Sequence, residues 1–121
     1  MADNRYIEVL YKVPNKKAKR IRIENTLEDM QELVKGYLEI LRYNDVFLIY
    51  NEERNRKKVE PNIVLENNII FGSFFLVGDD SRNADFISLN ERQFRKYKKE
   101  FSKKFELEQE MECELEWNEV K

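Results

Sequence analysis

Five polar side chains between apolar segments could bind a small ligand. They are an asparagine–glutamate pair, a second asparagine and an aspartate pair: Asn51, Glu52, Asn62, Asp79 and Asp80. Carboxylates with asparagine oxygens can hold a divalent cation, and an amide can read the edge of a nucleobase. Loops set on a rigid sheet are common places for binding residues. The competing interpretation is that the asparagines and Asp79 satisfy turn backbone, while the glutamates are solvated.

A basic block followed directly by a glutamate block could bind a partner macromolecule. Residues 92–104 carry a net charge of about +6 (seven Lys and Arg against one Glu), and residues 106–119 carry about −7 from seven glutamates. The side chains expected to contact a partner are Arg95, Lys99, Glu108, Glu112 and Trp117.

Each block has a functional and a plain interpretation. A basic helix face can contact phosphates. Glutamates alternating along a strand repeat at roughly 6.6–6.8 Å, close to the phosphate spacing along one DNA strand, so the acidic block could imitate DNA. The alternatives are a solvated helix face, an edge strand kept soluble by charge, or pairing of the blocks within the chain or between two copies.

Composition excludes several kinds of active site. The chain has no histidine and one cysteine, Cys113, so histidine-based nucleophiles, histidine metal ligands and cysteine zinc sites are absent. A lone cysteine cannot form an internal disulfide, which favours a reducing, cytoplasmic setting. The net charge of −2 indicates neither a general nucleic-acid binder nor an acidic solvating protein, and a nucleic-acid partner is not expected. No apolar run approaches the roughly 18 residues that span a bilayer.

The elements that would position these residues follow from apolar periodicity. Alternation predicts four strands, at residues 6–13, 18–23, 37–41 and 46–50. Asn25 or Thr26 is the expected N-cap of a short helix that ends near Lys35, with Gly36 as the residue that leaves the helix. The polar stretch that runs from Asn51 to Asn62 is predicted to be a long loop.

The second half of the chain centres on one apolar run. Residues 69–80 predict a single buried central strand that is closed by the turn signal Gly78-Asp79-Asp80, and Gly72 and Gly78 mark a bulge or a close backbone approach. Residues 79–84 predict a polar loop. Ser88 and Glu91 predict a capping box that opens a second helix. The inner face of that helix is apolar: Leu89, Phe94, Tyr97, Phe101 and Phe105. From Phe105 to Trp117 the period becomes two, which predicts a C-terminal strand.

Several segments carry a family resemblance. They are the N-terminal hairpin, residues 23–39, Asn51-Glu52-Glu53 with Pro61-Asn62, and residues 70–80. Over roughly residues 6–105 they resemble an uncharacterised domain family (DUF3846-like) that is common in phages and mobile elements of Firmicute bacteria. The resemblance implies a small intracellular protein without established catalytic residues. The chain departs from the family at Arg54-Asn55-Arg56, where relatives tend to have a glycine, and in its glutamate-rich tail.

These observations predict an α+β domain over residues 1–105, with a mostly antiparallel sheet of five or six strands and two helices. Residues 106–121 are predicted to be an acidic extension, a strand of the same domain or of a dimer interface. The expected function is non-catalytic: a phage or mobile-element accessory protein that binds a host macromolecule and could interfere with host defence or regulation. No cofactor is expected.

The alternative is a module that sequesters a nucleotide-like small molecule through the polar loops. A carboxylate-based metal enzyme is a third class. It is disfavoured because no acidic cluster has distinctive spacing.

Overall fold

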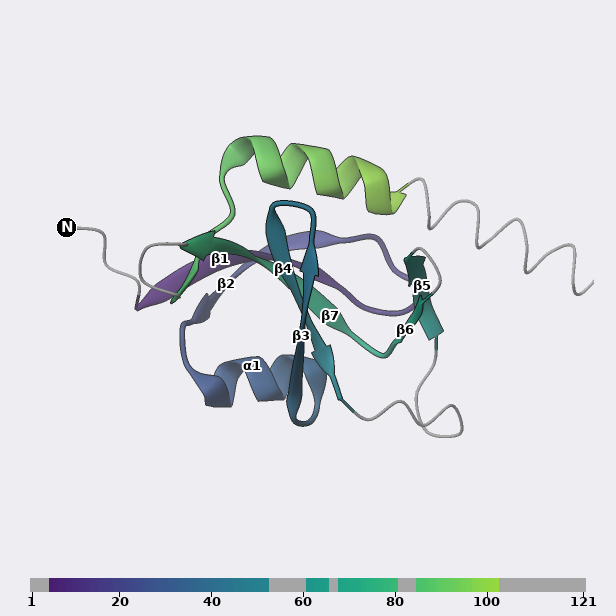
Figure 1. Cartoon of the computed structure of the whole chain (residues 1–121), viewed down its shortest axis with the longest axis horizontal. Coiled ribbons are helices and arrows are strands. Elements are labelled where there is room, and N and C mark those ends of the chain that lie inside the picture. The colour runs from purple at the N-terminus through teal and green to yellow at the C-terminus, as the bar shows by residue number, and fades with distance from the viewer. Residues whose placement is uncertain (1–4, 53–60, 66–67, 81–84, 103–121) are drawn as a thin grey trace, which may run out of the picture.

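The computed structural model describes residues 5–52, 61–65, 68–80 and 85–102. Within them, an antiparallel sheet is covered by one helix on each face (Figure 1). The main sheet has the order β2-β1-β7-β4-β3, and β8 pairs with β7 beside this path. A separate two-stranded sheet joins β5 to β6. The predicted fold class, α+β with a mostly antiparallel sheet and two helices, is confirmed.

The strands of the main sheet are β1 Tyr6–Lys12, β2 Lys19–Glu24, β3 Leu38–Tyr43, β4 Val46–Asn51, β7 Phe74–Asp80 and β8 Asp85–Ile87. Those of the small sheet are β5 Pro61–Leu65 and β6 Asn68–Phe71. The four strands predicted in the first half of the chain therefore exist, each within two residues of its expected bounds at either end.

β7 is the central strand, but the apolar run that predicted it is two strands. Gly72 has a φ of 75°, a left-handed conformation that glycine adopts freely, and it separates β6 from β7. β6 therefore pairs with β5, while β7 lies between β1 and β4. Gly78 does mark a close approach, since a Cβ there would lie 2.7 Å from the Ser88 carbonyl oxygen.

Two segments predicted to be loops are strands. Pro61 and Asn62 open β5, where proline is tolerated because it is the first residue of the strand. Asp79 and Asp80 end β7 and pair with β8. Both segments were predicted to be loops because they are polar. They are strands because another segment pairs with each of them, β6 with β5 and β8 with the end of β7.

Helix α1, Leu27–Val34, packs on one face of the sheet. Thr26 caps it as predicted, and its Oγ1 accepts a hydrogen bond of 3.2 Å from the Asp29 amide. The residue in the left-handed conformation at its end is Lys35, with φ 60°, and not Gly36. Glycine is required at position 36 for a different reason: a Cβ there would lie 2.5 Å from Nδ2 of Asn51.

The C-terminal helix, described over residues 91–102, covers the opposite face. Its core side chains are Phe94, Tyr97 and Phe101, as predicted. In the part of the chain that the structure describes, neither helix has the length and hydropathy to cross a membrane. Phe105, the predicted C-terminal strand, Glu108, Glu112 and Trp117 lie outside the described residues.

Candidate functional site

The C-terminal helix begins with a reciprocal capping box. The Asn90 Oδ1 accepts a hydrogen bond of 2.8 Å from the Gln93 amide, and the Gln93 Oε1 accepts one of 3.0 Å from the Asn90 amide. The box predicted at Ser88 is therefore displaced by two residues. The Ser88 Oγ instead accepts a hydrogen bond of 2.8 Å from the Glu8 amide, which fixes the chain before the helix to β1.

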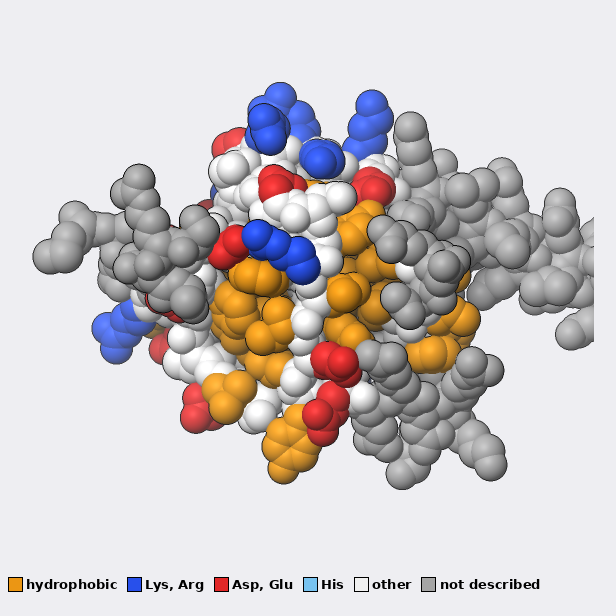
Figure 2. Space-filling view, viewed as in Figure 1, with side chains coloured by type: hydrophobic (Ala, Val, Ile, Leu, Met, Phe, Trp, Pro, Cys, Tyr) orange, Lys and Arg blue, Asp and Glu red, His pale blue; other side chains and the backbone are white. Residues whose placement is uncertain are grey.

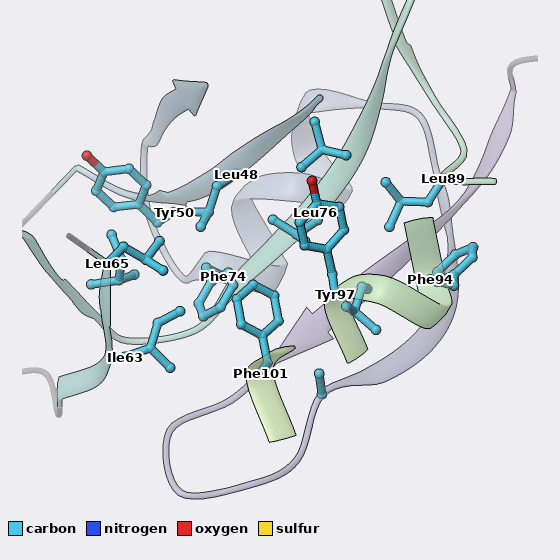
Figure 3. Close-up of a cluster of buried hydrophobic side chains, with 14 residues drawn as sticks. Leu48, Tyr50, Ile63, Leu65, Phe74, Leu76, Leu89, Phe94, Tyr97 and Phe101 are labelled. Atoms are coloured by element: carbon cyan, nitrogen blue, oxygen red, sulfur yellow. The ribbon is translucent and has the colours of Figure 1, made fainter. Parts of the chain in front are cut away.

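Three aromatic side chains hold the helix on the sheet. Phe94, Tyr97 and Phe101 are 6%, 0% and 0% exposed. Figure 3 shows all three pointing from the helix into the apolar cluster on that face of the sheet. The ring of Phe101 meets that of Phe74 edge-on, with centroids 5.4 Å apart. Rotation of the helix about its own axis would expose these rings, so the direction of its outer face is fixed.

Polar contacts tie the same helix to the turn between β3 and β4. The Tyr97 hydroxyl donates to Asp45 Oδ1, and Gln93 Nε2 donates to Asp45 Oδ2 at 2.9 Å. The bond from Gln93, followed by that from Tyr97, holds the pKa of Asp45 below its ordinary value. Burial, reinforced by Asp45, raises the pKa of Tyr97 to about 12. Near the other end, the Tyr43 hydroxyl donates to Glu100 Oε1 at 2.6 Å.

Arg20 fastens the start of the helix to the N-terminal hairpin. Its guanidinium donates to Glu8 at 2.9 and 3.1 Å, donates to Glu91 at 2.8 Å, and lies 4.2 Å from the Phe94 ring centroid. The hydrogen bond with Glu8, followed by that with Glu91, raises the pKa of Arg20. The same contact lowers the pKa of Glu8. Arg20 is therefore a structural cation, engaged by two carboxylates.

The outer face of this helix carries a basic stripe. We give that name to Arg92, Arg95, Lys96 and Lys99, whose spacing of three, four and seven residues places them in one line opposite the buried rings. All four are exposed, as is the neighbouring Lys98. The line is about 10 Å long at 1.5 Å per residue. Figure 2 shows Lys and Arg side chains projecting over the helix at the top of the view.

The cations of the stripe form no ion pairs with described residues, although the charge of Lys96, after the hydrogen bonds from Gln93 and Tyr97, also lowers the pKa of Asp45. None of its four cations forms an ion pair or a hydrogen bond with another side chain there, in contrast to Arg20 and Arg42. The Lys96 ammonium lies 5.1 Å from the Tyr97 ring centroid. A line of charge held on a rigid helix, with few neighbours of opposite sign, is a surface suited to an acidic partner. Arg95 and Lys99, expected to contact a partner, both belong to it.

Asn51, one of the predicted ligand residues, lies at the end of β4, and its side chain caps the C-terminal end of helix α1. Its Nδ2 donates to the carbonyl oxygens of Val34 and Lys35, at 3.1 Å each. These carbonyls have no partner within the helix, so the amide satisfies groups that helix geometry leaves open. Asn51 is only 9% exposed. Its neighbour Glu52 is exposed, in agreement with the interpretation that it is solvated.

Asn62 is the centre of a buried polar cluster. Its Nδ2 donates to the backbone oxygens of Lys12 (3.0 Å) and Gly72 (2.8 Å), and its Oδ1 accepts from Lys12 Nζ at 2.8 Å. Asn62 is 2% exposed and Lys12 0%. The buried lysine was not predicted. The signal was present, because Lys12 has the same strand parity as the buried Leu10 and therefore faces the same core.

The two aspartates lie far from the two asparagines. Asn51 follows Tyr50, which pairs with Phe74 at the start of β7, whereas Asp79 lies five residues further along that strand, about 17 Å away. Asp79 forms an ion pair of 2.6 Å with Arg42, and its side chain is 16% exposed. The five residues therefore do not converge on one pocket, and ligand binding by them stays a prediction.

Other features of the described surface add no site chemistry. In the described ranges, no group of three or more histidine, cysteine, aspartate or glutamate side chains is placed to hold a metal ion. A hollow of about 560 Å³ lies where β1 and β2 meet α1, lined by Tyr6, Arg22, Ile23, Glu24 and Asp29. It is open to solvent, and none of the five predicted ligand residues lines it.

Comparison with known proteins identifies the family but no function. No curated protein and no solved structure matches the chain. Residues 7–102 match the family described as a domain of unknown function (DUF3846); because this match covers well over half of the sequence, the chain belongs to that family, as the resemblance of its segments predicted.

Proposed function

We propose that this chain is a non-catalytic binding module that docks the basic stripe of its C-terminal helix on an acidic surface of another protein. The observation that carries the proposal is the stripe itself: four exposed cations in one line, none of them in an ion pair with a described residue. A helix locked by three buried aromatic rings presents them in a fixed arrangement, so little conformational entropy of the backbone is lost on binding.

The charge of this surface should raise the association rate and the selectivity for a partner more than it raises the affinity. Complementary potentials raise association rates and disfavour like-charged partners, and their effect falls as salt screens them. Rim charges of this kind change the association rate when mutated. We therefore expect binding that weakens steeply with ionic strength.

An acidic protein fits the stripe better than a nucleic acid does. The side-chain amide of Gln93, next to the stripe in sequence, has both its atoms engaged, Oε1 with the Asn90 amide and Nε2 with Asp45, so it is not available to read bases. The stripe is only about 10 Å long, which limits the number of phosphates that it can neutralise.

The setting that we propose follows from the family resemblance. A small cytoplasmic accessory protein of a phage or mobile element would meet host proteins, and an acidic site on a host defence or regulatory protein is the partner class that we favour. The acidic tail with Glu108, Glu112 and Trp117 would add a second contact to the same partner.

Capture from a host lysate with matched variants tests this function. The full chain, immobilised, should retain a partner that Arg95→Glu/Lys99→Glu loses. The control, Lys16→Glu/Lys17→Glu, makes the same change in net charge at the exposed tip of the β1–β2 hairpin and should retain the partner. Equal capture by both variants, with melting temperatures unchanged, would contradict the proposal.

A further inference from the structure

The basic stripe has a complementary surface within this protein's own sequence. Residues 92–104 carry about +6, and residues 106–119, which follow at once, carry about −7. The described helix shows that four of these cations lie in one exposed line. The acidic block offers glutamates at every second position from Glu106 to Glu116. Both partners of a charge-complementary contact are therefore encoded side by side.

The order of the two charge blocks selects one arrangement of two copies. When two chains run antiparallel through this region, the positive block of each faces the negative block of the other. When they run parallel, like charges meet. An antiparallel arrangement about a two-fold axis between the two blocks makes the two contacts identical, as an isologous dimer requires.

The same chain is a poor occupant of its own stripe. For Glu108 and Glu112 to reach back to the stripe, the chain would have to reverse between residues 102 and 108. Tight reversals rely on glycine, proline, asparagine, aspartate or serine, and the sequence there is Lys103-Lys104-Phe105-Glu106-Leu107. No glycine or proline occurs after Gly78. A second copy meets the acidic block without any reversal.

The acidic block also carries apolar side chains that need cover. Leu107, Met111, Leu115 and Trp117 interleave with the glutamates. Large apolar side chains such as these are more often buried than left exposed. A reciprocal contact can supply that cover twice, once in each copy.

We propose that two copies associate reciprocally, with the basic stripe of each receiving Glu108 and Glu112 of the other. This inference rests on the stripe used in the proposed function, but it requires no foreign partner. It adds a regulatory consequence: an acidic foreign partner competes with the second copy, so binding of that partner separates the dimer.

A charge-swap experiment on the full chain tests the proposal by light scattering at low ionic strength. The wild type should have the mass of a dimer. Arg95→Glu/Lys99→Glu and Glu108→Lys/Glu112→Lys should each be monomeric, because each places like charges opposite one another. An equimolar mixture of the two variants should regain the dimer mass, since every contact in the mixed dimer pairs opposite charges.

Fluorescence of Trp117, the single tryptophan, gives a second readout. Its emission should shift to longer wavelength in each variant and return in the mixture. A monomeric wild type, dimers that persist in both variants, or a mixture that stays monomeric would each overturn the proposal. These outcomes can be told apart from those of the lysate capture. A mixed dimer forms but no partner is captured if only the proposed function is wrong. A monomeric wild type that still captures a partner contradicts only the proposed dimer.

Discussion

At the scale of single residues, Asn62 joins three parts of the chain through one amide. It bonds the end of β1 and the Gly72 turn, and it accepts from the buried Lys12 ammonium. Asn62→Ala should lower the free energy of unfolding by about 3 kcal/mol, because it leaves two buried carbonyls and a buried cation short of partners. Urea unfolding of the wild type and the variant measures this difference.

The control for Asn62 is Gln31→Ala on helix α1. It removes an amide at a partly exposed position and should change stability by less than about 0.5 kcal/mol. Equal effects of the two substitutions would show that the buried cluster contributes no more than an ordinary surface amide.

At the scale of elements, the start of the C-terminal helix decides how the basic stripe is aimed. Asn90→Ala removes the side-chain acceptor of the capping box and should cost about 1 kcal/mol of stability, whereas Asn90→Ser should retain most of it, because serine is also a good N-cap. Thermal unfolding followed by circular dichroism compares the two. If alanine and serine behave alike, the helix does not depend on this cap.

The turn between β3 and β4 should make stability depend on pH. The pKa of Asp45 is lowered in the folded protein, so Asp45 favours folding at pH values above 3.8, its ordinary pKa, and this contribution is lost as the pH falls through the folded value. Asp45→Asn should therefore be less stable than the wild type at pH 7, with the difference shrinking in acid. Urea unfolding of both proteins between pH 7 and acid measures the difference in stability. A difference that does not depend on pH would contradict a lowered pKa of Asp45 in the folded protein.

Elements with strong local signals could be predicted from the sequence. The alternation of β1, the Thr26 cap and the aromatic face of the C-terminal helix depend on residues close together in the chain. The errors share the opposite property. The strand at Pro61 exists because β6 pairs with it. Ser88 does not cap the helix, because its Oγ accepts a hydrogen bond from the amide of Glu8, eighty residues away.

The candidate site divides in the same way. Arg95 and Lys99 could be placed on an exposed face because helix periodicity is local. The hydrogen bonds of Asn51 and Asn62 to backbone carbonyls agree with the interpretation that these asparagines satisfy backbone groups. Which groups could not be predicted, because they lie at the end of α1 and at the Gly72 turn. An asparagine in a polar stretch looks the same in sequence whether its amide meets a ligand or a backbone carbonyl.

At the scale of the whole molecule, the two faces of the sheet differ. Helix α1 closes one core, and the C-terminal helix closes the other while turning a line of cations to solvent (Figures 1 and 2). Two cations on strands of the sheet, Arg20 of β2 and Arg42 of β3, form ion pairs with carboxylates. Those of the stripe are not paired with described residues, and this contrast makes the helix the preferred docking surface.

The most direct test of that surface is the reactivity of its lysines toward an acetylating reagent, read by mass spectrometry on the full chain. The rates at Lys96 and Lys99 should fall in a host lysate relative to the dilute purified protein, because a docked partner covers them. The rates at Lys16 and Lys17, on the hairpin tip, should stay unchanged and serve as the internal control. Unchanged rates at Lys96 and Lys99, or equal protection of all four lysines, would contradict docking through the basic stripe.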